Sequence, residues 1–423
     1  MSKSIVFIGT GGSSGHTLGA LESSLSRLLG DVRFHFIDTL PFNLRTGGHT
    51  SYNGSGKRID TSMADVGMRR LSSSLSFNFL LSGGPIMMRK LERYASGILG
   101  GRHDAMVMVH DRVYIEQAFV RAARHSGTPS VILQEGPFVH VGSDTPQKPM
   151  LRLKHAIAPI LTRSGLLPSM PRYGFAGHDC IVVPSVAYRK RFVAAGMPSD
   201  RIAIGGVPRY DPIARLAEQS RPAGAASGPL QLLYLFQPFG EHGKVEPRVA
   251  RATQLAMIEG INCAGRARDL HATIRIHPRS TPESVAHLTS ALDISHTVDL
   301  CSDPIEQAIN ASDLVLGHYS SGLLEAMVLS RPVMCIPIPE RAFAELSESK
   351  KQRWMARSGA ALATDAPEIA HALMNFDRSD PRLVPVSVLE DEIGRVDGNA
   401  ADRCAQAIAS LITTRDKSCS QDA

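Results

Sequence analysis

Aromatic residues are scarce in this chain, at 5% of 423 residues, which argues against a protein that binds nucleic acid by stacking on bases. No apolar run approaches the roughly 18 residues that a membrane-spanning helix needs. The six cysteines form no CxxC pair, which argues against a zinc site and fits a reducing compartment. Residues 5–8 form an apolar run with neither a basic segment nor a long apolar segment before it. We therefore expect no secretion signal and a cytoplasmic location.

The net charge of +6 is unevenly distributed along the chain. Residues 1–213 carry 25 Lys and Arg against 14 Asp and Glu, whereas residues 214–423 carry 21 against 26. A basic first half is expected to meet an anionic partner, such as a membrane surface, a lipid-linked acceptor or an acidic polymer. An ordinary solvated surface would show the same excess.

Short apolar runs alternate with segments of helical periodicity twice along the chain, on either side of a Ser-, Gly- and Ala-rich stretch. The sequence predicts strands at 5–8, 33–37, 104–110, 130–133, 180–183 and 201–204, then at 230–236, 272–276, 297–300, 313–316 and 333–336. Residues 41–85 look like a long loop with a helical patch near 64–75. This pattern predicts an α/β protein with two Rossmann-like parallel-sheet domains facing a cleft.

The predicted domain boundaries follow from that linker. Residues 1–213 form an acceptor-side domain, 214–229 the linker, 230–395 a nucleotide-sugar-binding domain, and 396–423 a C-terminal helix and tail. In open parallel sheets, ligands bind beyond the carboxyl ends of the strands. Five turns lie at such ends, namely 9–16, 134–137, 237–240, 275–279 and 317–322.

The turn 317–322 is the strongest phosphate-site candidate. Ser320, Ser321 and Gly322 lead from a strand into a helix, where free backbone N–H groups and the helix dipole favour an anion. Glu325 lies one turn later and could accept hydrogen bonds from a ribose. Alternatively, the serines only cap the helix.

A second cluster of polar residues is predicted on the same donor side. Arg275, His277 and Arg279 surround a strand end that Pro278 terminates, and together they could neutralise a leaving phosphate. The amide of Gln237 could contact a base or a phosphate, or stand in a plain turn.

Glu135 is the preferred general base, because it follows a buried strand and precedes Gly-Pro. Asp111 and His16 are its competitors. Gly11 and Gly12 belong to a tight strand–helix turn that could line the acceptor or a sugar phosphate. A structural role for Glu135, at the end of a neighbouring helix, remains open.

Residues 148–172 combine Lys, Arg and His with Leu, Ile and Met. Such a stretch can lie on an anionic membrane, or it can be a surface helix whose long cations extend into water. No DxD motif offers a metal clamp, because Asp377 and Asp380 are too widely spaced. We therefore expect no metal and no cofactor besides a nucleotide-sugar co-substrate.

The second half of the chain resembles GT-B glycosyltransferases with His-Pro and Ser-Ser motifs, which include bacterial polysialyltransferases, capsule Kdo transferases and CDP-glycerol glycerophosphotransferases. His277-Pro278 and Ser320-Ser321 are similar to those two motifs, and Glu135-Gly136 to the end of the motif that carries the base, although Gln134 replaces its first acidic residue. Residues 205–211 and 397–403 are similar to further segments of this group, and the Gly-rich turn 9–16 to N-acetylglucosaminyltransferase loops. The resemblance implies that His277 and the serines bind a donor phosphate and that Glu135 is the base.

The same residues leave two alternatives to a metal-independent transfer onto a surface polysaccharide or lipid-linked glycan. His110-Asp111, Glu135, His277 and the segment 320–326 also resemble non-hydrolysing UDP-N-acetylglucosamine 2-epimerases, although that family's Arg-Pro-Glu is missing from the opening turn. A nucleotide-sugar-binding partner subunit without a base of its own is the third possibility. CMP-linked donors fit the His-Pro and Ser-Ser motifs, and UDP-linked donors fit the first turn.

Overall fold

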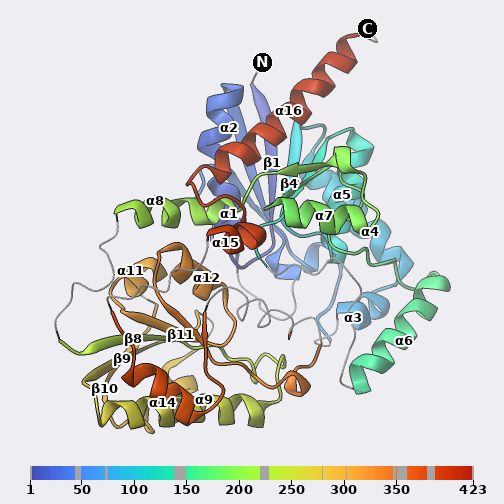
Figure 1. Cartoon of the computed structure of the whole chain (residues 1–423). Helices are drawn as coiled ribbons and strands as arrows, with labels where there is room; N and C mark the ends of the chain where they lie inside the picture. Colours follow the sequence, from blue (N-terminus) through green and yellow to red (C-terminus); the bar gives the residue numbers. More distant parts are fainter. Residues whose placement is uncertain are drawn as a thin grey trace. The chain divides into compact units, whose positions relative to one another are not determined.

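A computed structural model describes residues 2–42, 49–71, 75–137, 149–219, 228–278, 280–301, 303–345, 349, 360–378 and 386–421. The chain divides into two compact units (Figure 1). The first comprises Met1–Ser143, Leu153–Asp211 and Glu390–Ala423, and the second comprises Asp144–Arg152 and Pro212–Leu389. Each unit has its own parallel sheet, so the chain twice forms an α/β arrangement.

The first unit contains a seven-stranded sheet in the order β3-β2-β1-β4-β5-β6-β7, with every described pairing parallel. Its strands are β1 (Lys3–Gly9), β2 (Val32–Asp38), β3 (Lys57–Asp60), β4 (Ala105–Met108), β5 (Ser130–Leu133), β6 (Cys180–Val183) and β7 (Ile202–Ile204). The central strands are buried on both faces, as expected where helices cover a parallel sheet on both sides.

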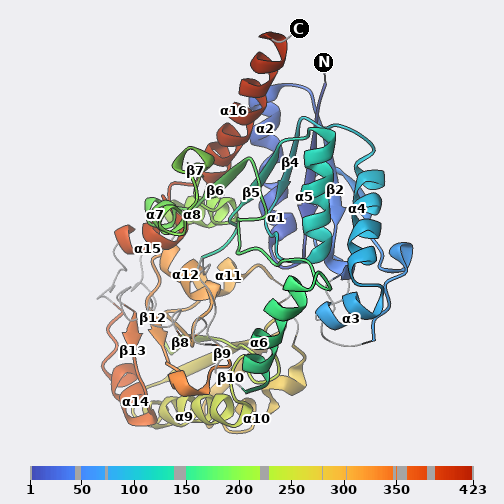
Figure 2. The same ribbon diagram turned by 90° about the vertical axis from the view of Figure 1, so that its right-hand side faces the viewer.

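Alternate residues of the central strands enter two separate cores, because successive side chains of a strand point to opposite faces. Val6 and Ile8 join the core formed with α4 (Pro85–Leu99) and α5 (Tyr114–Ser126), while Ile5 and Phe7 join the core formed with α2 (Glu22–Leu29) and α16 (Ala400–Gln421). Figure 2 shows these helix pairs on opposite sides of the sheet. The helices and short 3-10 turns of this part of the chain are α1 (Ser14–Gly19), α2 (Glu22–Leu29), η1 (Leu40–Phe42), η2 (Ala64–Val66), α3 (Leu75–Leu81), α4 (Pro85–Leu99), α5 (Tyr114–Ser126), α6 (Pro149–Arg163), α7 (Val186–Ala194), η3 (Ser199–Arg201), η4 (Pro208–Tyr210), α15 (Val386–Ile393) and α16 (Ala400–Gln421).

The C-terminal helix α16 is part of the first unit's core. Cys404 and Ile408 are fully buried there. The carboxylate of Asp211 accepts hydrogen bonds from the backbone N–H groups of Ala400 and Ala401, at 2.9 and 2.7 Å. These bonds satisfy two of the unpaired donors at the start of α16. The last helix thus closes one face of a sheet that begins near residue 3.

The second unit contains a six-stranded parallel sheet in the order β10-β9-β8-β11-β12-β13. Its strands are β8 (Leu230–Leu235), β9 (Leu270–Arg275), β10 (Ser295–Asp299), β11 (Leu314–Gly317), β12 (Val333–Cys335) and β13 (Ala361–Leu362). Its helices are α8 (Asp211–Gln219), α9 (Pro247–Gly265), η5 (Pro282–Val285), α10 (Ala286–Thr289), α11 (Ile305–Asn310), α12 (Ser321–Val328), η6 (Glu340–Ala342) and α14 (Ala366–Met374). Residues of α9 and α14 pack on one sheet face, with Met257, Ile258, Ile369 and Leu373 in the core.

These two parallel sheets confirm the predicted fold class. Several element boundaries differ from the expectation. The segment 41–85, expected to be mostly loop, contains the edge strand β3 and helix α3. Among the described residues, no helix combines the length and apolarity required to cross a membrane.

Candidate active site

Glu135 lies just beyond the carboxyl end of β5, and the pKa of its carboxyl group is raised well above the ordinary value. The hydroxyl of Ser13 donates a hydrogen bond to it, and the guanidinium of Arg209 and the imidazole of His110 lie close by. Its Oε2 atom is buried with no hydrogen-bond partner among the described residues. Burial raises the pKa of Glu135 to about 7, although Arg209, His110 and Ser13 oppose the shift. A carboxyl group that titrates near neutral pH at a strand end is suited to proton transfer.

Ser13 and Arg209 join this group without having been predicted as site residues. Arg209, in η4, donates from Nη1 to Ser13 Oγ at 3.2 Å and from Nη2 to the Tyr210 hydroxyl at 2.6 Å. Its guanidinium also lies 4.7 Å from the centre of the Tyr210 ring. The signal in the sequence was the Gly-Gly-Val-Pro turn after β7, which ends a strand just before this arginine. The contact between residues 13 and 209 required the fold.

His110 is a further titratable group that sequence reasoning left without a role of its own. Its Nδ1 lies 2.6 Å from Oε2 of Glu116, a residue of α5 that is almost wholly buried, while the His110 side chain is 38% exposed. Burial disfavours the imidazolium, but the ion pair with Glu116 and the nearby Asp111 outweigh it and raise the pKa of His110. His110 is therefore a second candidate for proton transfer, close enough for its charge to lower the pKa of Glu135.

Asp111, the predicted competitor of Glu135, is fully buried. Its Oδ2 accepts hydrogen bonds from the backbone of Gly174 at 3.0 Å and Ala176 at 3.2 Å, and lies 3.5 Å from His178 Nε2. The other oxygen, Oδ1, is buried and has no hydrogen-bond partner among the described residues. One oxygen of Asp111 thus holds residues 174 and 176 in place, and the choice between Glu135 and Asp111 as the base stays a prediction.

The first turn adopts the backbone that its glycines permit. Gly11 and Gly12 have φ angles of +93° and +61°, a region that favours glycine, and a Cβ at Gly11 would lie 2.6 Å from Leu40. The Ser14 hydroxyl accepts from Thr10 N at 3.0 Å and donates to Gly11 O at 2.7 Å. His16 is exposed on α1.

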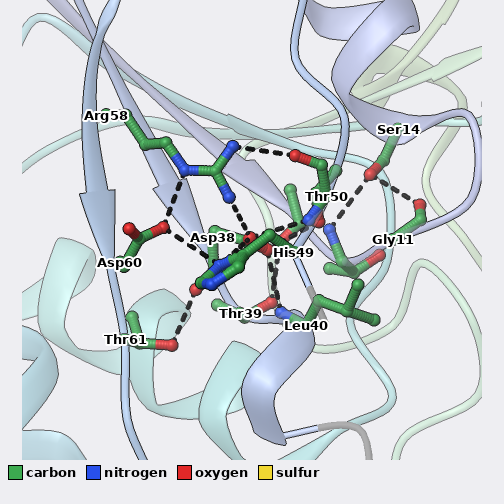
Figure 3. Close-up of polar contacts among 12 residues, drawn as sticks. Gly11, Ser14, Asp38, Thr39, Leu40, His49, Thr50, Arg58, Asp60 and Thr61 are labelled. Carbon is green, nitrogen blue, oxygen red and sulfur yellow. Dashed lines mark hydrogen bonds and ion pairs between the residues drawn. The ribbon is translucent and has the colours of Figure 1, made fainter. Parts of the chain in front are cut away.

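The polar cluster beside this turn could be mistaken for a metal site (Figure 3). The Nδ1 atom of His49 lies 3.5 Å from Asp38 and 3.4 Å from Asp60, and the three residues could in principle hold a cation. However, Arg58 donates to both carboxylates, at 2.6 and 2.7 Å, and the backbone and hydroxyl of Thr50 also donate to Asp38. A metal ion would have to displace Arg58, so we interpret the cluster as a tie between β2, β3 and residue 50.

In the second unit, the loop after β11 is fixed by the buried His318. Its Nδ1 lies 2.8 Å from the carbonyl oxygen of Ile336, which can only accept, so Nδ1 carries the proton and Nε2 accepts from the Tyr234 hydroxyl at 3.0 Å. Burial lowers the pKa of His318 to about 4, so the ring is neutral at neutral pH. This anchor holds the start of the predicted phosphate turn.

The turn itself leads directly into α12. The side chain of Ser320 accepts from Gly322 N at 3.1 Å and so caps the helix, the role expected if these serines are structural. Ser321 is half-buried, and Glu325 is 8% exposed. A Cβ at Gly322 would lie 2.8 Å from the Leu235 side chain and 3.1 Å from the Ile305 side chain, so the turn packs closely here. The first turn of α12 still offers backbone N–H groups to an anion.

The predicted cluster around His277 is only partly assembled. His277 is half-buried, and its ring meets that of His242 edge-on at 5.6 Å. Arg275 instead points to the neighbouring strand, where it pairs with Asp299 at 2.5 Å and with the Asp303 carbonyl at 2.6 Å. Arg279 lies outside the described residues. Two polar atoms near these strand ends, Gln237 Oε1 and Ser280 Oγ, are buried without a hydrogen-bond partner among the described residues.

No protein-family model matches the chain, and no curated protein sequence matches it. Solved structures do match over almost its whole length. They include a protein assigned as a UDP-N-acetylglucosamine 2-epimerase from Listeria monocytogenes, with a TM-score of 0.60, 11% identity and 98% of both chains covered. The S. aureus protein MnaA bound to UDP gives a TM-score of 0.56 at 13% identity, covering 98% of this chain and 97% of that one.

The wall teichoic acid polymerase TagF is a third similar structure, with a TM-score of 0.51, 13% identity, and coverage of 98% of this chain and 90% of the other. The structures similar to this chain therefore include proteins described as 2-epimerases and a polymerase. At this level of identity the likeness establishes the fold, with two Rossmann-like domains, and leaves the activity to the site residues.

Proposed function

We propose that the protein is a glycosyltransferase that moves a sugar from a CMP- or UDP-linked donor to a surface polysaccharide or lipid-linked glycan, without a metal ion, at the cytoplasmic face of the membrane. One observation carries the proposal. Glu135 is a buried carboxyl group with a pKa of about 7 and an oxygen that lacks a hydrogen-bond partner among the described residues. Such a group is costly to fold and useful for accepting a proton.

The first unit would supply the proton acceptor. The Glu135 carboxylate takes the proton of an acceptor hydroxyl, whose oxygen bonds to the anomeric carbon of the donor sugar. The bond from that carbon to the phosphate oxygen then breaks, and the phosphate keeps its electron pair. Arg209, hydrogen-bonded to Ser13, lowers the pKa of Glu135 against the effect of burial, so that part of the Glu135 population is a carboxylate at neutral pH.

The second unit would bind the donor. The first turn of α12, with Ser320, Ser321 and Gly322, offers backbone donors to the phosphate, and Glu325 would accept from the ribose. His277 would donate to the phosphate oxygens, and the buried oxygens of Gln237 and Ser280 leave acceptors for the nucleotide. Neighbours of the same fold were solved with UDP and with UDP-GlcNAc, which supports a nucleotide-linked donor.

A second activity, 2-epimerisation of a UDP-linked N-acetylhexosamine, is supported by the second proton-transfer group. Removal and return of a proton on opposite faces of a carbon needs two such groups, and His110, whose own pKa is raised, is close enough for its charge to lower the pKa of Glu135. The similarity to epimerase structures is compatible with this activity.

The experiment combines nucleotide binding with product analysis. A nucleotide at about 100 times its dissociation constant stabilises a protein by about 2.7 kcal/mol, so a thermal-shift screen of CMP, CDP, UDP and GDP and their sugar conjugates should identify the donor. The best conjugate is then incubated in D2O without an acceptor. Deuterium at C2 of the sugar would establish the epimerase. A donor that stays unchanged without an acceptor, and is consumed once a glycan acceptor is added, would establish the transferase. Absence of any nucleotide hit would refute both.

A further inference from the structure

Exposed apolar side chains are concentrated in one part of the first unit. Sixteen large apolar side chains are exposed among the described residues, and nine of them lie between positions 71 and 170. The exposed fraction is 55% for Leu81, 60% for Ile86 and 64% for Ile160. Scattered single residues of this kind are normal on a surface, but a concentration marks an interaction site.

These side chains come from two segments that adjoin in the fold. Leu80 of α3 and Leu161 of α6 pack against the same core cluster. A Cβ at Gly84, between α3 and α4, would lie 3.3 Å from the carbonyl oxygen of Leu166, just after α6. Figures 1 and 2 both show α3 and α6 near one another. The exposed apolar residues therefore belong to one region, whose apolar part comprises Leu81, Ile86, Ile157, Ile160 and Leu166.

The same region is basic. Residues 66–91 and 149–172 each contain four Lys or Arg and no Asp or Glu. Arg89 and Lys90 on α4 and Arg163 at the end of α6 are exposed. On α6, Ile157 and Ile160 are three positions apart and lie on one helix face, as in helices that rest in a membrane interface. Together with the five apolar residues, these three cations form what we call the basic apolar surface.

We propose that the basic apolar surface docks the protein on an anionic lipid bilayer. Anionic headgroups would pair with the cations while the apolar side chains enter the boundary of the acyl chains. An acidic polymer would leave the apolar side chains in water, and a second copy meeting the same surface would set cations against cations. The contact would be peripheral, because no helix of the described part of the chain can cross the bilayer. The inference extends the proposed function, since it gives a lipid-linked acceptor a place to meet the protein, but docking itself needs no catalysis.

The test is sedimentation of the full chain with vesicles of phosphatidylcholine alone and of phosphatidylcholine mixed with phosphatidylglycerol, at low and high salt. We expect binding only to the mixed vesicles, weakened by salt. Arg89→Ser combined with Lys90→Ser should lower the partition coefficient about 30-fold, because each cation near an anionic surface contributes about 1 kcal/mol and about 1.4 kcal/mol is tenfold. Ile157→Ser combined with Ile160→Ser should abolish binding, because both apolar anchors are lost.

Helix α7 provides matched controls within the same unit. Arg189 and Lys190 form an exposed basic pair there, and Val186 and Val193 are exposed apolar residues at 56% and 43%. Serine substitutions at either pair should leave vesicle binding unchanged. Equal losses from the α7 pairs, equal binding to neutral vesicles, or no binding to any vesicle would overturn the proposal. The proposal would also be overturned if the protein formed an oligomer without lipid and the Ile157→Ser, Ile160→Ser variant were monomeric.

The nucleotide thermal shift separates this inference from the proposed function. The surface variants should keep the wild-type shift, and Glu135→Gln should keep wild-type vesicle binding. Loss of lipid binding with an intact nucleotide shift would therefore concern the surface alone.

Discussion

Replacement of Glu135 by Gln should make the protein more stable and less active at the same time. In the unfolded chain this carboxyl group has its ordinary pKa of 4.5, and burial in the fold raises the pKa to about 7. The folded state thus binds the proton more tightly, so stability falls as the pH rises through this window. At 1.36 kcal/mol per pKa unit, the loss above about pH 7 amounts to about 3 kcal/mol relative to pH 4.5. Glutamine carries no charge, so the variant escapes this loss.

The assay for stability is urea denaturation of wild type and variant on both sides of the window. The two proteins should differ little below about pH 4.5, and the variant should be more stable by up to about 3 kcal/mol above about pH 7. In the transfer assay, loss of a general base should lower the rate about 10²–10⁴-fold. The nucleotide thermal shift should remain, because the predicted donor groups lie in the second unit.

A matched control is Glu92→Gln on the surface of the same unit, where Glu92 pairs with Arg121 at 2.6 Å. That variant should change neither transfer nor the pH dependence of stability by a comparable amount. A Glu135→Gln protein that is less stable than wild type above about pH 7 would refute the burial argument. Full transfer activity in this variant would refute the role of Glu135, and would point to Asp111, to His16 or to a partner subunit that supplies the base.

Arg209→Gln should move the acidic limb of the pH–rate profile to higher pH, because Arg209 holds the pKa of Glu135 down; Arg209→Lys keeps the charge and should restore much of the profile. His277→Ala should weaken donor binding or turnover at least ~100-fold if the imidazole meets a buried phosphate. The control is His271, whose ring is hydrogen-bonded to Ser295 at an exposed position; His271→Ala should bind nucleotide with wild-type affinity. Acidification should destabilise the fold through His318, because its pKa is about 4 in the folded state and 6.5 in the unfolded chain. The contribution of His318 to the free energy of unfolding is complete above about pH 6.5 and is lost as the pH falls toward about 4. The melting temperature of His318→Asn should depend less on pH across this range than that of wild type. An unchanged dependence would mean that other groups cause the acid destabilisation.

The sheets could be predicted from sequence because their strands are short and continuously apolar. Residues 5–8 and 130–133 read as buried parallel strands, and both are buried in the structure. The strand β3 could not be found this way, because Lys57, Arg58 and Asp60 give it no apolar pattern. Its register against β2 is instead supported by Arg58, which reaches Asp38 twenty positions earlier. Propensity rules do not describe a strand held by such a distant ion pair.

The candidate site shows the same limit. Strand order placed Glu135, Gln237 and Ser320 at the carboxyl ends of strands, where parallel sheets bind ligands. It could not pair Ser13 with Arg209 across 196 positions, nor show that Arg275 turns to Asp299 and away from His277. The direction in which a side chain points, and the group that it bonds, depend on how the strands pack together. The local sequence carries little of that information.

Buried polar atoms that lack a partner strengthen the case that these strand ends bind something. Native folds satisfy nearly all buried polar groups, because each unsatisfied one costs about 1–3 kcal/mol. Among the described residues, Gln134 Oε1 and Glu135 Oε2 follow β5, and Gln237 Oε1 follows β8 by two positions. Stability alone would favour an apolar side chain at each of these positions. In both units these atoms lie beyond the carboxyl ends of parallel strands, where parallel sheets bind ligands. This placement is expected if substrate atoms supply their missing hydrogen-bond partners.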